Sequence, residues 1–257
     1  MTATKSSPTV SATYVPGEWE LRQRLALCYH LVEFYGWNDT IFNHISVRVP
    51  GPDRHFLINP FGLNYFEITA ANLVKVDLNG NAVGNAEINY AGFLIHSAIH
   101  ENREDAHCVI HVHTVAGQAV ACKKDGLSHD TFTGALLYGK VAYHDFEGVV
   151  LNADEKARIV QDMGDKRVLI LRNHGFLVAS ETIESAFFGL WGLMDACEVQ
   201  AVRDRIAGPN VELSVALKEH SAAIDQDQGG KLAGKFFDAA VRRMHATNFR
   251  RFADINA

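Results

Sequence analysis

Two histidines that stand one residue apart indicate the chemistry that this chain could perform. His111 and His113 lie in a run of β-forming residues from Cys108 to Thr114. Side chains on a strand point alternately to its two faces, so these two imidazoles project to the same side. Two imidazoles on one face can bind a single divalent ion. The alternative is a hydrogen-bonded polar pair at a strand end, because the chain contains 13 histidines.

A divalent site that keeps one position open for substrate usually has three protein ligands. His174 is the candidate for the third ligand. It stands between two apolar runs, 168–171 and 176–178, which are typical of buried strands, and Asn-His-Gly is typical of a tight connection between them. We therefore predict that these three histidines converge on one ion.

The elements that must position these residues alternate along the chain. Apolar residues recur at intervals of three and four where we predict helices, and they alternate or run together where we predict strands. A polar linker at 226–230 is expected before the last helix, and Asn79-Gly80 predicts an antiparallel hairpin. The predicted helices cover 19–35, 87–101, 115–123, 154–162, 183–205 and 232–244. The predicted strands cover 41–49, 55–59, 74–78, 82–83, 108–114, 139–146 and the two runs beside His174.

Other polar residues are weaker candidates for the site. Asn43 and Ser46 could contact a ligand or make ordinary strand-end hydrogen bonds. His96 and His100 lie one helical turn apart, where we expect a pair on the helix surface rather than ligands. Glycine in the turn Pro60-Phe61-Gly62 would let backbone amides approach a ligand, or merely supply a positive φ.

Composition restricts the class of protein. The 257 residues are 47% hydrophobic and 21% charged, which fits one large globular domain or two small ones. The net charge of -6 disfavours nucleic acids and anionic membranes as partners, since both bind through clustered Lys and Arg. No apolar run reaches the roughly 20 residues that span a bilayer. Four widely spaced cysteines are typical of a reduced, cytoplasmic protein.

We expect three parts along the chain. Residues 1–17 are a mobile N-terminal tail because their Ser, Thr, Ala and Pro show no hydrophobic period. Residues 18–208 form the main domain, and residues 209–257 form a C-terminal helical extension.

Several ordered motifs resemble the class II aldolase/adducin family, most closely the adducin head domain, over about residues 19–205. The resemblance implies an α/β fold, a three-layer α/β/α sandwich with a central, mostly antiparallel sheet. It also implies a homo-oligomer, commonly a tetramer with sites at subunit borders, and it matches His111, His113 and His174 to the family's zinc-binding histidines. The motifs are 42–46 (FNHIS), 60–62 (PFG), 91–100 (AGFLIHSAIH), 111–113 (HVH), 141–145 (VAYHD) and 172–175 (RNHG).

The chain departs from this family at the place of the catalytic glutamate. The resemblance puts that glutamate at Gly92, which cannot transfer a proton, and Glu87 lies more than one helical turn earlier. The family's phosphate cradle is weakened too, because Phe61 and Tyr90 stand where small hydroxyl residues are expected. Asn43 and Gly62 remain as candidates for substrate binding.

The first functional hypothesis is a metal-dependent carbon-carbon lyase, either an aldolase or a decarboxylase, that acts on a small hydroxy-carbonyl molecule. Zn²⁺ is the expected ion, with Fe²⁺ or Mn²⁺ as alternatives, and it would polarise the substrate as a Lewis acid. The missing acid or base is typically worth about 10² to 10⁴ in rate. Tyr143 and Asp145 are the candidates to replace it, although a hydrogen-bonded strand end is the favoured interpretation of each residue taken singly.

Two other hypotheses come from different classes. One is a non-catalytic binding or assembly protein, for which the likeness to adducin implies actin as a partner. The other is a three-histidine iron oxygenase on the same fold, because imidazole suits iron as well as zinc.

Overall fold

The central element is a seven-stranded sheet with the order β3-β2-β1-β4-β7-β6-β5. The computed structural model describes residues 14–84, 86–150, 152–247 and 252–256, without the side chains of 226–228. Neighbouring strands are antiparallel except for the parallel pair β5 and β6, so the mostly antiparallel sheet is confirmed. The strands are β1 (His44–Arg48), β2 (Phe56–Ile58), β3 (Val74–Val76), β4 (Cys108–Val112), β5 (Val141–His144), β6 (Val168–Leu171) and β7 (Gly175–Ser180).

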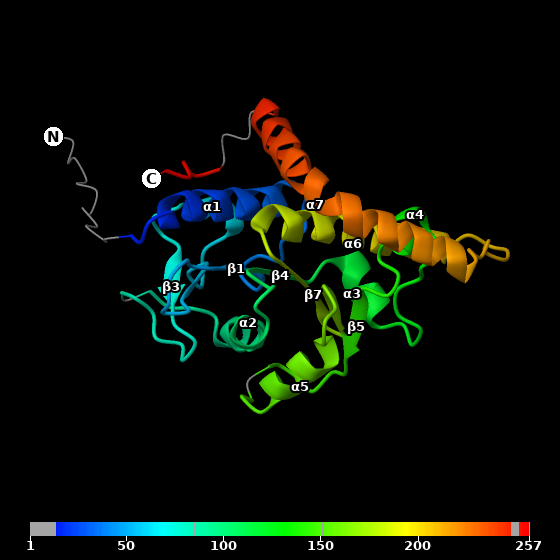
Figure 1. The fold of residues 1–257 in the computed structure, drawn as a ribbon, viewed down its shortest axis with the longest axis horizontal. Coiled ribbons are helices and arrows are strands. Elements are labelled where there is room, and N and C mark those ends of the chain that lie inside the picture. The colour runs from blue at the N-terminus through cyan, green and yellow to red at the C-terminus, as the bar shows by residue number, and fades with distance from the viewer. Residues whose placement is uncertain (1–13, 85, 151, 248–251, 257) are drawn as a thin grey trace.

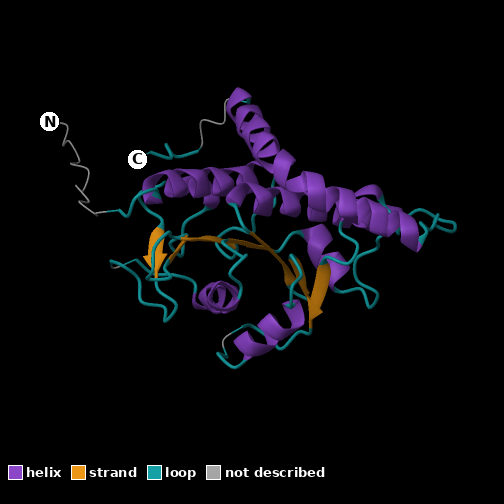
Figure 2. Cartoon of the chain, viewed as in Figure 1, coloured by secondary structure: helices purple, strands orange, loops and turns teal. Residues whose placement is uncertain are grey.

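Helices cover both faces of the sheet and complete three layers (Figures 1 and 2). One face packs against α1 (Glu18–Phe34), α3 (Val115–Ala121) and α6 (Ile183–Arg203), and α7 (Val215–Ala246) packs on α1 and α6. The other face packs against α2 (Tyr90–Asn102) and α5 (Glu155–Met163). The remaining helices are α4 (Phe132–Leu136), which contacts α6 and α7, and the 3₁₀ turn η1 (Tyr65–Glu67).

The period of two on β1 decides which residues reach each layer. Ile45 and Val47 enter the core under α1 and α6. His44 and Ser46 must therefore point to the opposite face, toward α2. Their side chains meet histidines of α2 there, so polar residues on one side of a buried strand lie in the layer that also contains His111.

Two sequence expectations are wrong. Residues 226–230 do not form a linker, because α7 continues through them from Val215 to Ala246. Packing of α7 on α6 and on the core, through Phe237 among others, overrides the weak helix propensity of two adjacent glycines. The expected surface pair is also wrong, since His96 and His100 are 0% and 1% exposed. Their ring nitrogens find partners inside the protein instead of water.

The boundaries of the three predicted parts remain a prediction. Residues 1–13 of the expected tail lie outside the described residues. Within the part of the chain that the structure describes, no helix is both long and apolar enough to cross a membrane.

Candidate metal centre

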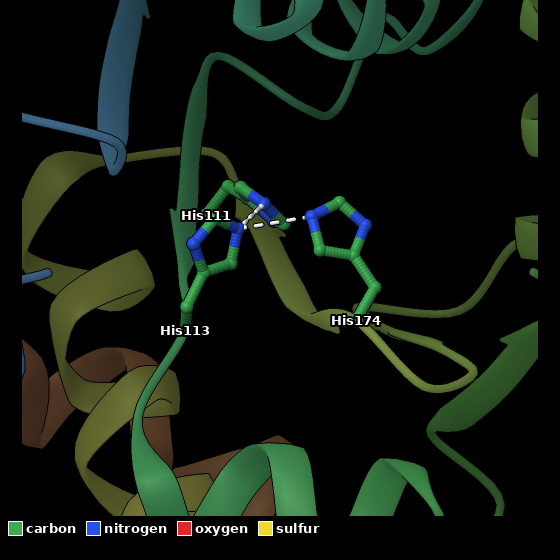
Figure 3. A group of neighbouring side chains, drawn as sticks. All are labelled: His111, His113 and His174. Atoms are coloured by element: carbon green, nitrogen blue, oxygen red, sulfur yellow. Dashed lines mark hydrogen bonds between the residues drawn. The ribbon is translucent and has the colours of Figure 1, made fainter. Parts of the chain in front are cut away.

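The rings of His111, His113 and His174 face one another (Figure 3). His113 Nε2 lies 2.7 Å from His111 Nε2 and 3.0 Å from His174 Nε2. One potential ligand atom from each residue falls within 4.8 Å of the other two. The structure thus brings together all three residues that the sequence proposed as ligands, and we call them the histidine cluster.

Groups behind the cluster orient two of its rings. His111 Nδ1 lies 3.0 Å from the carbonyl oxygen of Phe176 on the neighbouring strand β7. A carbonyl oxygen only accepts hydrogen bonds, so Nδ1 carries the proton and Nε2 keeps its lone pair. His113 Nδ1 faces Asp39 Oδ2 at 3.4 Å and is oriented in the same way. Such partners fix the tautomer of metal-binding histidines.

The connection from β6 to β7 brings His174 to the other two rings. Asn173 has a φ of 56°, a left-handed conformation in which Asn is enriched. Gly175 then lets β7 approach β4, because a Cβ on this residue would lie 2.7 Å from the backbone oxygen of Val112 and 2.9 Å from the ring of His113. The Asn-His-Gly motif is therefore required by the geometry of the cluster.

Burial keeps the cluster neutral near pH 7. It holds the pKa of His111 well below its usual value and lowers that of His174 to about 4, with the neighbouring His113 as a lesser cause. Burial also lowers the pKa of His113, against the opposite effect of Asp39. The Nε2 atoms of His111 and His113 keep their lone pairs and face each other at 2.7 Å, so these two rings cannot satisfy one another. They suit a divalent cation, which binds imidazole in this form.

The cluster lies at the wall of an open cavity of about 420 Å³. Most of the remaining wall is apolar or aromatic, and Asp39, His44 and Tyr90 supply its other ionisable side chains. The apolar and aromatic part comprises Phe42, Phe61, Tyr90, Ala91, Ile95, Phe146, Val149 and Val150.

A second group of histidines, missed by the sequence analysis, lies behind the cluster. His44 stacks on His111, with ring centroids 4.8 Å apart and an interplanar angle of 20°. His44 Nδ1 is 2.8 Å from His96 Nε2, and Ser46 Oγ lies between His96 Nδ1 and His100 Nε2. We call these four residues the histidine chain. The signal was a polar residue at every second position of β1, opposite two histidines spaced four apart on α2.

Gly92 explains how His44 fits beside His111. A Cβ at Gly92 would lie 2.5 Å from His44 Cδ2 and 2.7 Å from His44 Nε2. Real atoms do not approach so closely, so any side chain at this position would displace the imidazole. The place that the resemblance assigns to the family's glutamate is therefore filled by the His44 ring.

The other candidate residues lie outside the cavity wall, and their roles remain predictions. Asn43 is fully buried and its amide donates to the backbone oxygen of Trp37. Gly62 is exposed, while Phe61 beside it reaches the cavity. The Tyr143 hydroxyl accepts from Leu127 N, 3.0 Å away. Asp145 lines a different, more open depression.

Residues 23–201 match the family described as Class II Aldolase and Adducin N-terminal domain. The chain belongs to this family. Alpha-adducin of Rattus norvegicus is 47% identical over 195 residues, which are 74% of this chain but only 26% of that protein. The chain therefore spans about a quarter of the adducin.

Two solved structures have the same fold. An aldolase II superfamily protein from Pseudomonas syringae superposes with a TM-score of 0.85 at 42% identity, over 91% of this chain and 95% of that one. L-fuculose 1-phosphate aldolase from Glaciozyma antarctica superposes with a TM-score of 0.80 at 27% identity, over 97% of both chains. These matches confirm the predicted fold class and family.

Proposed function

We propose that this protein is a divalent-metal-dependent carbon-carbon lyase, with Zn²⁺ as the expected ion and a small hydroxy-carbonyl compound as substrate. The observation that carries the proposal is the convergence of three histidine rings, with their Nε2 atoms toward one another, at the wall of an open cavity. The similarity in fold to a sugar-phosphate aldolase supports the same class of reaction.

A bound ion would polarise the substrate carbonyl and stabilise the negative charge that bond cleavage leaves. The chain contributes the rest. The histidine cluster holds the ion, while Asp39 and the Phe176 carbonyl keep two of its rings in the ligand tautomer. Phe42, Phe146 and Val149 make part of the cavity wall apolar.

The wall of the cavity favours a substrate without a phosphate group. None of the described residues that line it is Lys or Arg. The N-terminus of α2 is also occupied, because Asn89 Oδ1 accepts from Gly92 N at 3.2 Å. Substrate charge would therefore be met by the ion alone, which suits a hydroxy acid and its decarboxylation or aldol cleavage.

Elemental analysis of protein purified without a metal-affinity tag tests the proposal. We expect about one zinc ion per chain, and a several-fold lower metal content in His113→Ala with an unchanged circular dichroism spectrum. His107→Ala is the control, because His107 is exposed and lies outside the cavity wall. Metal content that is unchanged in His113→Ala would refute the ligand assignment. Bound iron with oxygen uptake would favour the oxygenase instead.

A second candidate function is a non-catalytic assembly role of the adducin type. Its support is the 47% identity to alpha-adducin. Co-sedimentation with filamentous actin tests it, and the metal analysis separates it from the lyase. A tetramer, the oligomer that the family likeness implies, is checked in the same preparation by light scattering.

A further inference from the structure

We propose that His44 presents an unprotonated Nε2 to the cavity as the acceptor for a substrate hydroxyl, in a tautomer fixed by the histidine chain behind it. The choice of substrate rests on the proposed function. The tautomer does not, because it follows from the hydrogen bonds of the protein alone.

The histidine chain begins at the carbonyl oxygen of Ala106, which can only accept a hydrogen bond. His100 Nδ1 lies 3.1 Å from the carbonyl oxygen of Ala106, so Nδ1 must carry a proton. His100 is 1% exposed, and the guanidinium of Arg48 donates to its backbone oxygen. Burial beside a cation disfavours a second proton on the ring. His100 Nε2 is therefore an acceptor.

The next three groups follow in order. Ser46 Oγ, 2.7 Å from His100 Nε2, uses its only proton to donate to that nitrogen. It must then accept from His96 Nδ1. His96 is fully buried and neutral, so its Nε2 has no proton and accepts from His44 Nδ1 at 2.8 Å. His44 is left with its proton on Nδ1 and a lone pair on Nε2.

The free nitrogen lies at the cavity. His44 lines it together with His111, on which its ring is stacked. Nε2 lies beside the backbone of Gly92, within the space that a side chain would occupy. The hydrogen bonds of the described residues give Nε2 no partner, in contrast to Nδ1 of the same ring.

An acceptor at this position discriminates between substrates. A hydroxyl group can donate to His44 Nε2, whereas a carbonyl or carboxylate oxygen cannot. A site built to bind a hydroxyl loses affinity for an analogue that lacks it, because the buried acceptor is then left unpaired. His44 would thus be a positioning group for the hydroxyl of a hydroxy acid held at the ion.

Nitrogen-15 NMR of the imidazoles in metal-free protein tests the tautomer. We expect protonated Nδ1 and unprotonated Nε2 shifts for His44, His96 and His100. Ser46→Ala removes the group that enforces the direction, so His44 should become a mixture of tautomers, whereas Ser46→Thr keeps the hydroxyl and should keep one tautomer. A wild-type His44 that is protonated on Nε2 would overturn the proposal.

Calorimetry of the zinc-loaded protein with lactate and with propionate tests the role. His44→Leu should weaken lactate binding by about 3- to 10-fold, the usual worth of one hydrogen bond, and leave propionate binding unchanged. His44→Gln retains an acceptor and should recover part of the loss. Equal losses for both acids in His44→Leu would refute the role. Failure to load zinc would remove the proposed function, while the NMR result on metal-free protein would still decide the tautomer.

Discussion

The two groups of histidines on the α2 side of the sheet use their ring nitrogens in opposite ways. In the histidine cluster, potential ligand atoms of three rings lie within 4.8 Å of one another, and the lone pairs of His111 and His113 face each other. In the histidine chain, each donor faces an acceptor, and the direction is set at the Ala106 carbonyl. In our proposal the first group binds a cation, whereas the hydrogen bonds of the second are complete without one. The role of a buried histidine therefore depends on its partners and not on its burial.

Lowering the pH should have the largest effect on the stability of the protein. It tests whether the rings of the histidine chain are neutral in the folded state. Burial lowers the pKa of His44 and His100 to about 3 and that of His30 to about 4, against about 6.5 when unfolded. Below about pH 6.5 the unfolded state therefore binds more protons than the folded state. Stability is full above that pH and falls as pH is lowered toward about 4. Each residue contributes up to about 1.4 kcal/mol per pH unit.

Urea unfolding of metal-free protein between about pH 7.5 and about pH 5 measures this slope. His30→Gln is the matched variant, since His30 bonds the Ile68 carbonyl and lies outside both groups. It should reduce the slope by about 1.4 kcal/mol per pH unit at most. A free energy of unfolding that does not change over this range would show that the buried rings accept protons freely. That result would also refute the fixed hydrogen-bond direction of the histidine chain.

The second-largest effect is expected from zinc, whose stabilisation of the fold should distinguish the histidine cluster from the histidine chain. Metal that binds only the folded protein raises its stability by about 2.7 kcal/mol when the free ion is at 100 times its Kd. His174→Ala should lose most of this gain. His100→Gln should keep it, because His100 belongs to the chain and not to the cluster. Thermal melts with and without zinc measure both, and an equal loss in the two variants would erase the distinction between the groups.

Sequence reasoning found the cluster but not the chain, for a physical reason. The period of two on a single strand predicts that His111 and His113 share one face, and the apolar runs beside His174 place it in the connection between two strands. The histidine chain links residues of β1 to residues of α2. The hydrophobic period within one element does not predict which face of a helix will pack on which strand. His96 and His100 therefore looked like a surface pair, although both are buried.

The fold was more predictable than its long-range contacts. The helices and strands recur close to their predicted positions because hydrophobic periodicity is a local property. The continuity of α7 was not predictable in this way. Its adjacent glycines, Gly229 and Gly230, weaken the helix locally, and the contacts with α6 that compensate for them are distant in sequence. The position of the His44 ring beside Gly92 likewise depends on a tertiary contact between residues that are distant in sequence.

Ser46→Ala should cost about 1–3 kcal/mol of unfolding free energy in metal-free protein. The change leaves His96 Nδ1 and His100 Nε2 buried without their partner. Ser46→Thr should cost less, because it keeps the hydroxyl and β-branched residues suit strands. Chemical denaturation compares the two. Equal stability of Ser46→Ala and wild type would mean that the serine does not link the two rings.

Asp39→Asn should have the smallest effect and should touch the cluster alone. Asp39 faces His113 Nδ1 at 3.4 Å, and its side chain is 44% exposed, so solvent screens part of its influence. Partners behind metal ligands typically change metal affinity by about 10- to 100-fold, and this exposure argues for the lower figure. Zinc titration with a competing chelator measures the affinity. Asp53→Asn on an exposed turn is the control and should bind zinc as wild type does. A lower melting temperature of metal-free Asp39→Asn, with unchanged zinc affinity, would instead show that Asp39 stabilises the fold and does not support the metal ligands.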